Sequence, residues 1–211
     1  SPDIKEYAAP SFELECGDES LTERPVIIGF GPAGMFAGLL LARYGYKPLI
    51  LERGVSVAER VEAVENFIKF GVLDTSTNIQ FGAGGAGTFS DGKLTTRIND
   101  PLIMYVPDML HQLGAPDDIM YKAKPHIGTD ILRKVVENAD TEITRLGGEI
   151  RYKSKAENIT SSSVTVNGER IPCGAVILAC GHSARDTYSE LIGAGFSVEA
   201  KPFSVGVRAE H

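Results

Sequence analysis

Three glycines near the start of the chain have the spacing G-x-G-x-x-G. Gly29, Gly31 and Gly34 follow the apolar run Val26-Ile27-Ile28, which indicates a strand, a tight turn and the start of a helix. In such a unit the first glycine permits the turn, the second lets a diphosphate approach the backbone, and the third lets the helix pack closely on the strand. Amide groups at the helix start attract an anion, which the helix dipole also favours. The spacing therefore predicts a bound dinucleotide, with a purely structural glycine turn as the alternative.

An acidic residue ends the second apolar run. The run over residues 48–51 leads into Glu52. The spacing from Gly34 to Glu52 is close to the roughly 20 residues expected for a carboxylate that holds a ribose diol. Arg53 and Arg60 flank the same turn, on the side where a pyrophosphate would lie. Solvated arginines are the alternative for both.

Residues 80–94 form a second glycine-rich stretch. Its glycines argue against any regular element, so we expect a loop, and a flexible linker is the alternative. A linker would not need the apolar anchors Phe81, Phe89 and Leu94. Small residues expose amide groups to a ligand, and three side chains offer further donors to phosphate, hydroxyl or ring oxygens: Thr88, Ser90 and Lys93. We therefore expect this loop to contact the ligand.

Helical patterns separate these motifs. Ser56 and Glu59 have the spacing of a capping box, which predicts a helix that ends at Gly71. Its expected buried stripe is Val57, Val61, Val64, Phe67 and Ile68. Three more helices are expected: one that ends at Gly114, a strong one over residues 129–146 capped by Thr129, and a short one over residues 186–194. Residues 119–124 are expected to be extended.

The stretch over residues 149–172 changes to β character. It predicts a small antiparallel meander in which Asn167-Gly168 is a hairpin turn. The apolar run over residues 175–180 then suits a buried strand of a parallel sheet. Together with the first motif, this pattern predicts an α/β fold: a Rossmann-like doubly wound parallel sheet with a small antiparallel β meander. We interpret His126 and His182 as loop residues, with a role in a pocket as the alternative.

Composition limits the classes of function. The 211 residues carry a net charge of -7 and are 43% hydrophobic, which suits a globular core and small-molecule chemistry. Clustered Lys and Arg, expected of nucleic-acid or anionic-membrane surfaces, are missing from the sequence, and no apolar run is long enough to span a membrane. Cys16, Cys173 and Cys180 form no C-x-x-C pair, so we expect reduced thiols and a cytoplasmic protein. No metal-site spacing is found, and the oligomeric state stays open.

Six blocks of sequence together resemble the bacterial family labelled NAD(FAD)-utilizing dehydrogenases, or FAD-dependent dehydrogenases of uncharacterised substrate. The resemblance extends from about residue 24 to residue 211, and the blocks are residues 29–34, 51–54, 80–94, 124–130, 179–186 and 201–208. It implies FAD, possibly with NAD(P)H as electron donor, whereas the spacing of the glycines does not decide between FAD and NAD.

The resemblance also implies binding roles for particular residues. The pyrophosphate would be held by Gly29, Gly31, Pro32, Ala33 and Gly34, and the adenosine ribose by Glu52. The flavin half would lie against residues 84–94, which include Gly84, Gly85, Ala86, Gly87, Thr88, Ser90, Lys93 and Leu94. Ala156 would touch adenine through its backbone, and Ala179, Cys180 and Gly181 would pass near the cofactor.

Two departures from the family pattern matter. Ala83 stands where relatives would have an acidic residue, so no acid/base role is assigned to that position, and we name no catalytic residue. The late Gly-Asp pair that would hold the ribityl chain is missing, because the only such pair, Gly17-Asp18, precedes the fingerprint. We therefore expect this chain by itself to bind FAD weakly or not at all.

Both ends of the chain have the character of a fragment. The sequence starts without Met and stops within an expected final strand over residues 205–211. We expect an arm or the remnant of a preceding domain over residues 1–24, an incomplete FAD/NAD(P)-binding domain over residues 25–195, and the start of a truncated domain over residues 196–211.

The leading hypothesis is the FAD-binding portion of a flavin-dependent oxidoreductase that acts on a small molecule and uses a nicotinamide as electron partner. An NAD-dependent dehydrogenase is the first alternative, with Glu52 on the ribose diol. A nucleotide-binding module without turnover is the second. The absence of paired cysteines beside the first helix argues against a thiol-disulfide reductase.

Overall fold

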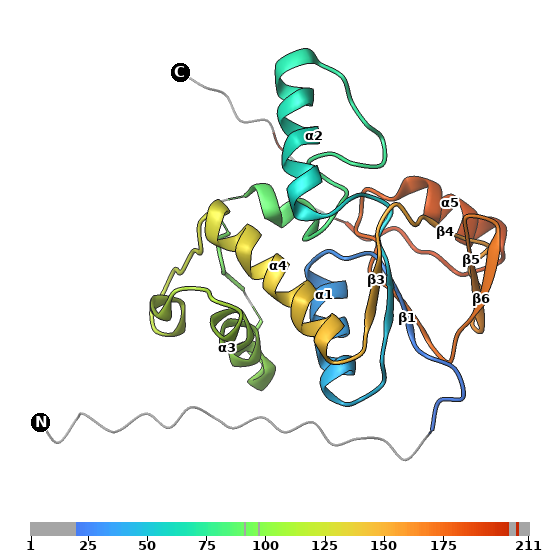
Figure 1. The fold of residues 1–211 in the computed structure, drawn as a ribbon, viewed down its shortest axis with the longest axis horizontal. Coiled ribbons are helices and arrows are strands. Elements are labelled where there is room, and N and C mark those ends of the chain that lie inside the picture. Colours follow the sequence, from blue (N-terminus) through green and yellow to red (C-terminus); the bar gives the residue numbers. More distant parts are fainter. Residues whose placement is uncertain (1–19, 91, 97, 203–205, 207–211) are drawn as a thin grey trace, which may run out of the picture.

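The structure is a computed structural model that describes residues 20–90, 92–96, 98–202 and 206. Within these residues a parallel four-stranded sheet has the order β3-β2-β1-β7 (Figure 1). Its strands are β1 (Val26–Ile28), β2 (Leu49–Leu51), β3 (Glu149–Arg151) and β7 (Val176–Leu178). A smaller antiparallel sheet contains β4 (Ala156–Glu157), β5 (Ser163–Val166) and β6 (Glu169–Pro172). Residues 1–19 of the expected arm, which include Cys16, and residues 205 and 207–211 of the expected final strand lie outside the described residues.

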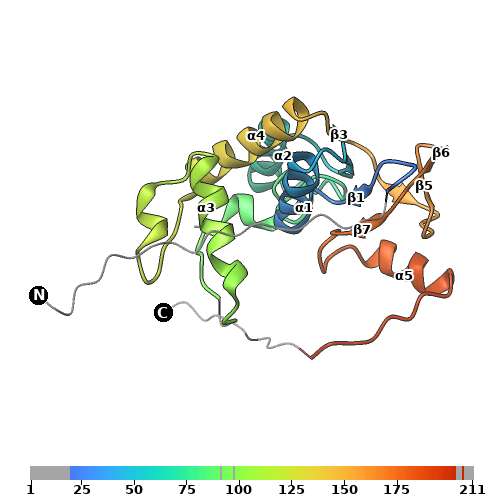
Figure 2. The same cartoon turned by 90° about the horizontal axis from the view of Figure 1, so that it is seen from below.

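Both faces of the parallel sheet are covered. Side chains alternate along a strand, so Ile27 and Ile50 pack in one apolar cluster while Val26 and Leu49 pack in another. The first cluster includes residues of α1 (Pro32–Arg43), α3 (Tyr105–Gln112) and α4 (Thr129–Arg145), and the second includes residues of the small sheet and α5 (Arg185–Gly193). Figure 2 shows α5 on the opposite side of the sheet from α1 and α4. The predicted fold class is confirmed.

Close packing of α1 on the sheet depends on small residues. A Cβ added at Gly38 would lie 2.5 Å from Cδ1 of Ile50, and one at Gly34 would lie 1.9 Å from the carbonyl oxygen of Gly29. Pro32 is the first residue of α1, where its missing N–H costs no hydrogen bond. The glycines of the first motif therefore set the position of α1 against β1 and β2.

The helix after β2 differs in part from its prediction. α2 (Val57–Phe70) ends at Gly71 as expected, and Val57 and Val64 are buried. Ile68, however, is 73% exposed, because the end of α2 stands away from the sheet (Figure 1). The expected capping box is also wrong.

The two residues of that expected box bond to each other. The Ser56 hydroxyl donates to the Glu59 carboxylate at 3.1 Å and makes no side-chain cap to the backbone. Lys153 approaches the other oxygen of this carboxylate at 3.0 Å, so Glu59 is shared between the Ser56 hydroxyl and Lys153.

Four other expectations are corrected. The start of the predicted meander, residues 149–151, is β3 of the parallel sheet, where it pairs with β2 as an edge strand and can therefore carry polar side chains. Residues 117–120 form the 3₁₀ helix η3 (Asp117–Met120) in place of extended chain, and Lys122 continues that turn by pairing with Asp118.

The N-cap of α4 is Gly128 and not Thr129 as expected. The Thr129 hydroxyl instead donates to the Ser90 carbonyl. β7 is only partly buried.

Two further expectations about the fold are confirmed, the hairpin turn and the helix before Gly114. Asn167 and Gly168 both have positive φ, as a two-residue hairpin turn requires. The helix near residues 101–113 begins as η2 (Pro101–Met104) and continues as α3. Within the described part of the chain, no helix combines the length and the apolar character needed to cross a membrane.

Candidate nucleotide-binding site

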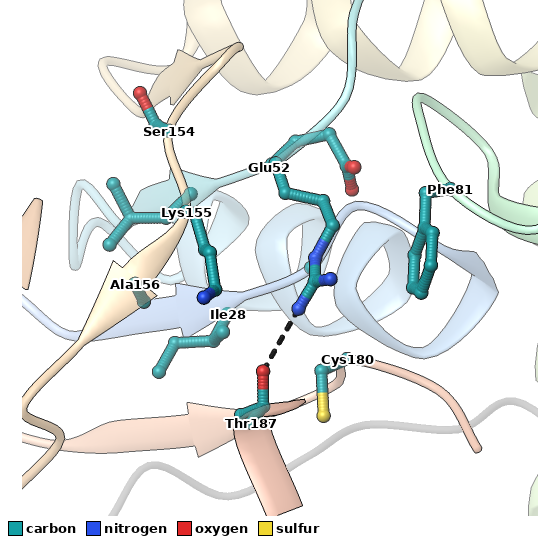
Figure 3. Close-up of a pocket in the computed structure, with 11 residues that line it drawn as sticks. Ile28, Glu52, Phe81, Ser154, Lys155, Ala156, Cys180 and Thr187 are labelled. Carbon is teal, nitrogen blue, oxygen red and sulfur yellow. Dashed lines mark hydrogen bonds between the residues drawn. The ribbon is translucent and has the colours of Figure 1, made fainter. Parts of the chain in front are cut away.

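A pocket opens at the carboxyl ends of β1 and β2 (Figure 3). Ile28 and Leu51 end those strands, and Ala156 of the small sheet closes one side. Its remaining lining residues are Gly29, Glu52, Arg53, Phe81, Ser154, Lys155, Cys180 and Thr187. We call this the first pocket. Ligands of open parallel α/β sheets bind outside this same edge, at the carboxyl ends of the strands.

A second pocket of about 440 Å³ adjoins the first. The two share Gly29, Glu52, Phe81 and Cys180, so they lie side by side. The second pocket is also lined by the turn before α1, by the glycine-rich stretch and by the segment after β7: Gly31, Pro32, Ala33, Gln80, Gly82, Gly85, Ala86, Gly87, Leu178, Ala179, Gly181, His182 and Ser183.

The expected strand-turn-helix geometry of residues 26–34 is confirmed. Gly29 has a φ of +103°, and a Cβ there would lie 2.5 Å from the Ala179 carbonyl oxygen, so the turn demands glycine. Gly31 precedes α1, and both Gly31 and Ala33 line the second pocket. The start of this 12-residue helix, where the first backbone amides have no acceptor within the helix, therefore lines the second pocket.

Glu52 lies at the junction of the two pockets. Its carboxylate is buried and accepts three backbone amides: Oε2 from Phe30 at 2.8 Å, and Oε1 from Gly54 at 2.9 Å and from Gly82 at 3.0 Å. A carboxylate has about four acceptor positions. Three described donors therefore leave Oε2 with one acceptor position at the pocket wall.

Arg53 belongs to a charged cluster beside the first pocket. Its guanidinium reaches both carboxylate oxygens of Asp186, at 3.3 and 3.0 Å, and donates to the Thr187 hydroxyl at 2.9 Å. Lys155 approaches the same carboxylate at 3.1 Å. Burial raises the pKa of Asp186, but the hydrogen bonds from Arg53 and Lys155 outweigh burial and lower that pKa to about 2. Arg53 therefore lines the pocket with its charge already paired.

Arg60 does not flank a pyrophosphate, and this expectation is corrected. The side chain is fully buried, and its donors reach five backbone carbonyls, those of Asn78, Ile79, Gly82, Ala83 and Gly85. Burial lowers the pKa of Arg60 to about 10, so the guanidinium stays charged at neutral pH. The glycine-rich stretch is folded around this cation.

The residues expected from positions 84–94 fall into three groups. Those that line the second pocket are Gly85, Ala86 and Gly87; those buried are Gly84 and Thr88; those outside both pockets are Ser90, Lys93 and Leu94. The Thr88 hydroxyl donates inward to the Ala83 carbonyl, and Lys93 forms a β-bridge with His126. The prediction of an irregular loop is also corrected, because η1 (Gly85–Phe89) is a short 3₁₀ helix held by the Arg60 side chain.

Sequence reasoning missed several lining residues. Ser154, Lys155 and Thr187 belong to no motif, and only the fold brings them to the first pocket. His182, interpreted as a loop residue, lines the second pocket, whereas His126 lines neither. Within the described ranges, no group of three or more His, Cys, Asp or Glu side chains could hold a metal ion.

No protein-family model matches the chain. A protein of Clostridium beijerinckii, named only as uncharacterized, is 53% identical over 203 residues, which are 94% of this chain and 38% of that protein. The chain therefore spans well under half the length of this relative.

Two solved structures are similar at low identity. The protein THI4 of Thermovibrio ammonificans has a TM-score of 0.52 and 16% identity over 83% of this chain and 64% of its own. An L-amino acid deaminase of Proteus vulgaris has a TM-score of 0.49 and 11% identity over 84% of this chain and 59% of its own. The sheet order, the small antiparallel sheet and the similarity to THI4 show that the chain has a Rossmann-like α/β fold.

Proposed function

We propose that the chain holds the ADP half of FAD in the two adjoining pockets, as part of a flavin-dependent oxidoreductase. The observation that carries this proposal is the position of Glu52, which lies beside Gly29 in the wall of both pockets. A ribose between a base in the first pocket and a pyrophosphate in the second would meet its carboxylate.

The residues present suit each part of such a ligand. Gly31 would meet the pyrophosphate without a side chain in the way, and the free amides of α1 would face its charge. Glu52 would accept a ribose hydroxyl, and Ile28 and Ala156 would pack against adenine. Ala179 and Cys180 would lie beside the dinucleotide near the glycine turn that precedes α1.

When bound, FAD supplies two-electron chemistry through its flavin ring. This chain would bind and orient the nucleotide half. We propose a nicotinamide as the electron partner and a small molecule as the substrate. We propose that the binding unit is residues 25–195. The net charge of -7 disfavours a nucleic-acid or anionic-membrane partner.

A second candidate, an NAD-dependent dehydrogenase, shares the adenosine and pyrophosphate groups, so Glu52 and the turn suit it as well. Separate titrations with FAD, ADP and NADH discriminate the two. We expect FAD and ADP to compete for one site, with FAD weak in this chain by itself. The visible spectrum of the longer protein before and after anaerobic NADH then tests flavin content and nicotinamide use. Binding of NADH without binding of FAD, or no binding of ADP, would contradict the proposal.

A further inference from the structure

Three of the carbonyls that surround Arg60 belong to peptides that shape the wall of the second pocket. Nη1 of Arg60 lies 3.3 Å from the Gly82 oxygen and 2.7 Å from each of the Ala83 and Gly85 oxygens. A trans peptide is planar, so its N–H points away from its C=O. Each carbonyl that turns toward Arg60 therefore turns the next residue's amide away from it.

Two of these three amides are used within the protein. The Ala83 amide donates to the Val55 carbonyl at 3.0 Å, and the Gly84 amide donates to the Phe30 carbonyl at 2.7 Å. The third is the Ala86 amide, which has no acceptor among the described residues, and Ala86 is exposed in the wall of the second pocket. The one remaining donor of the set thus belongs to a residue of the pocket wall.

The wall that carries Ala86 lies directly against the first glycine motif. A Cβ at Gly85 would lie 3.0 Å from Cα of Gly31, so these two glycines are in close contact. The Phe89 ring that follows contacts two cations, with the Arg60 guanidinium 4.8 Å and the Arg133 guanidinium 4.9 Å from its centre. Arg60 therefore holds this wall by hydrogen bonds to its carbonyls and by contact with the Phe89 ring.

We propose that Arg60 is a positioning residue for the candidate site: it turns the peptide between Gly85 and Ala86 so that the Ala86 amide donates to the pyrophosphate. Arg60 itself touches no ligand. This inference rests on the proposed function, and it assigns to a fully buried side chain the task of orienting one donor of the second pocket. A lysine would not replace it, because a compact ammonium cannot reach carbonyls spread across a planar fork.

The test measures ADP and adenosine affinities separately. Adenosine needs only the first pocket and Glu52, whereas ADP also needs the second. Arg60→Lys and Arg60→Met should weaken ADP binding by at least about tenfold, as expected for a lost hydrogen bond to a charged group, and change adenosine binding by less than about twofold. Arg133→Met is the matched control, because it removes the other cation from Phe89 without touching the carbonyls, and it should leave both affinities unchanged.

A second measurement starts from the wild-type protein. In wild-type protein the amide NMR signal of Ala86 should shift with ADP and not with adenosine, and in folded Arg60→Lys that shift should shrink. Equal loss of ADP and adenosine affinity would show a merely structural role and overturn the inference. Unchanged ADP affinity in the Arg60 variants would also overturn it. So would a wild-type Ala86 amide signal that does not shift when ADP is added. Wild-type protein that binds neither ligand would instead contradict the proposed function.

Discussion

The amide of Gly82 donates a hydrogen bond to Oε1 of Glu52 at 3.0 Å, across a separation of 30 residues in sequence. The same carboxylate holds Phe30 in the turn before α1. Glu52 therefore joins two glycine-rich segments that both line the second pocket. The Glu52 carboxylate, which is predicted to bind a ribose, thus also holds together the segments that line the site of that ribose.

This double role predicts that Glu52→Gln affects both stability and binding. Glutamine keeps one acceptor oxygen but turns an NH₂ group toward backbone amides, so at least one of three buried amides loses its acceptor. The expected loss is about 1–3 kcal/mol in the free energy of unfolding, measured by urea titration. ADP affinity should fall by at least about tenfold in the fraction that stays folded.

Glu65→Gln is the matched control, since Glu65 is exposed on α2. It should change neither stability nor ADP affinity. If Glu52→Gln behaves like this control, the three amide contacts do not hold the walls together.

A second prediction concerns the packing of α1. Gly34→Ala would place a Cβ 1.9 Å from the Gly29 carbonyl oxygen, and because that atom is backbone, α1 itself must move. We expect a loss of at least about 2 kcal/mol in the free energy of unfolding. Gly193→Ala makes the same chemical change at the end of α5, where a Cβ meets no described atom within 4 Å. Urea titrations that give equal stabilities for the two variants would contradict the close approach.

The sequence predicted best where spacing along the chain determines geometry. The turn at Gly29 and its helix form because a strand, a glycine turn and Pro32 follow each other directly. The distance from Gly34 to Glu52 likewise reflects one helix and one strand. These features need no knowledge of distant residues, so local patterns suffice.

The sequence failed where the outcome depends on which distant segments meet. Arg60 looked free for a phosphate, but residues 78–85 fold over it and bury it. Arg53 donates a hydrogen bond to Asp186, which is 133 residues away in sequence, and no spacing rule predicts that ion pair. Residues 149–151 alternate polar and apolar side chains, a pattern that an edge strand of a parallel sheet shares with an antiparallel strand, so the sequence does not distinguish the two.

The pair of Arg53 and Asp186 leads to a prediction of pH dependence. The pKa of Asp186 is lowered to about 2 in the folded chain, against about 3.9 for an unfolded aspartate. Between these values the unfolded state binds more protons, so stability falls as the pH drops. The contribution is fully present above about pH 5 and is lost as the pH falls toward 2.

Asp186→Asn should remove this contribution. The stability difference between wild type and variant should be constant from about pH 5 to 7 and shrink below about pH 4. Because the Asp186 side chain is 46% exposed, solvent screens the pair, and we expect a difference of about 1 kcal/mol or less. Urea titrations at each pH, repeated in about 1 M NaCl to screen the charges, check this. A difference that grows on acidification would contradict the assignment.

The last prediction concerns the apolar end of α2. Ile68 and Phe70 are 73% and 63% exposed, whereas Val64, one turn earlier, is 3% exposed. Ile68→Asp should therefore change the free energy of unfolding by about 0.5 kcal/mol or less. Val64→Asp, the same change to an acidic residue on the same helix, should cost at least about 3 kcal/mol, because it buries a charge without a partner. Urea titration followed by circular dichroism compares the two. A loss for Ile68→Asp as large as that for Val64→Asp would show that the end of α2 is covered in solution.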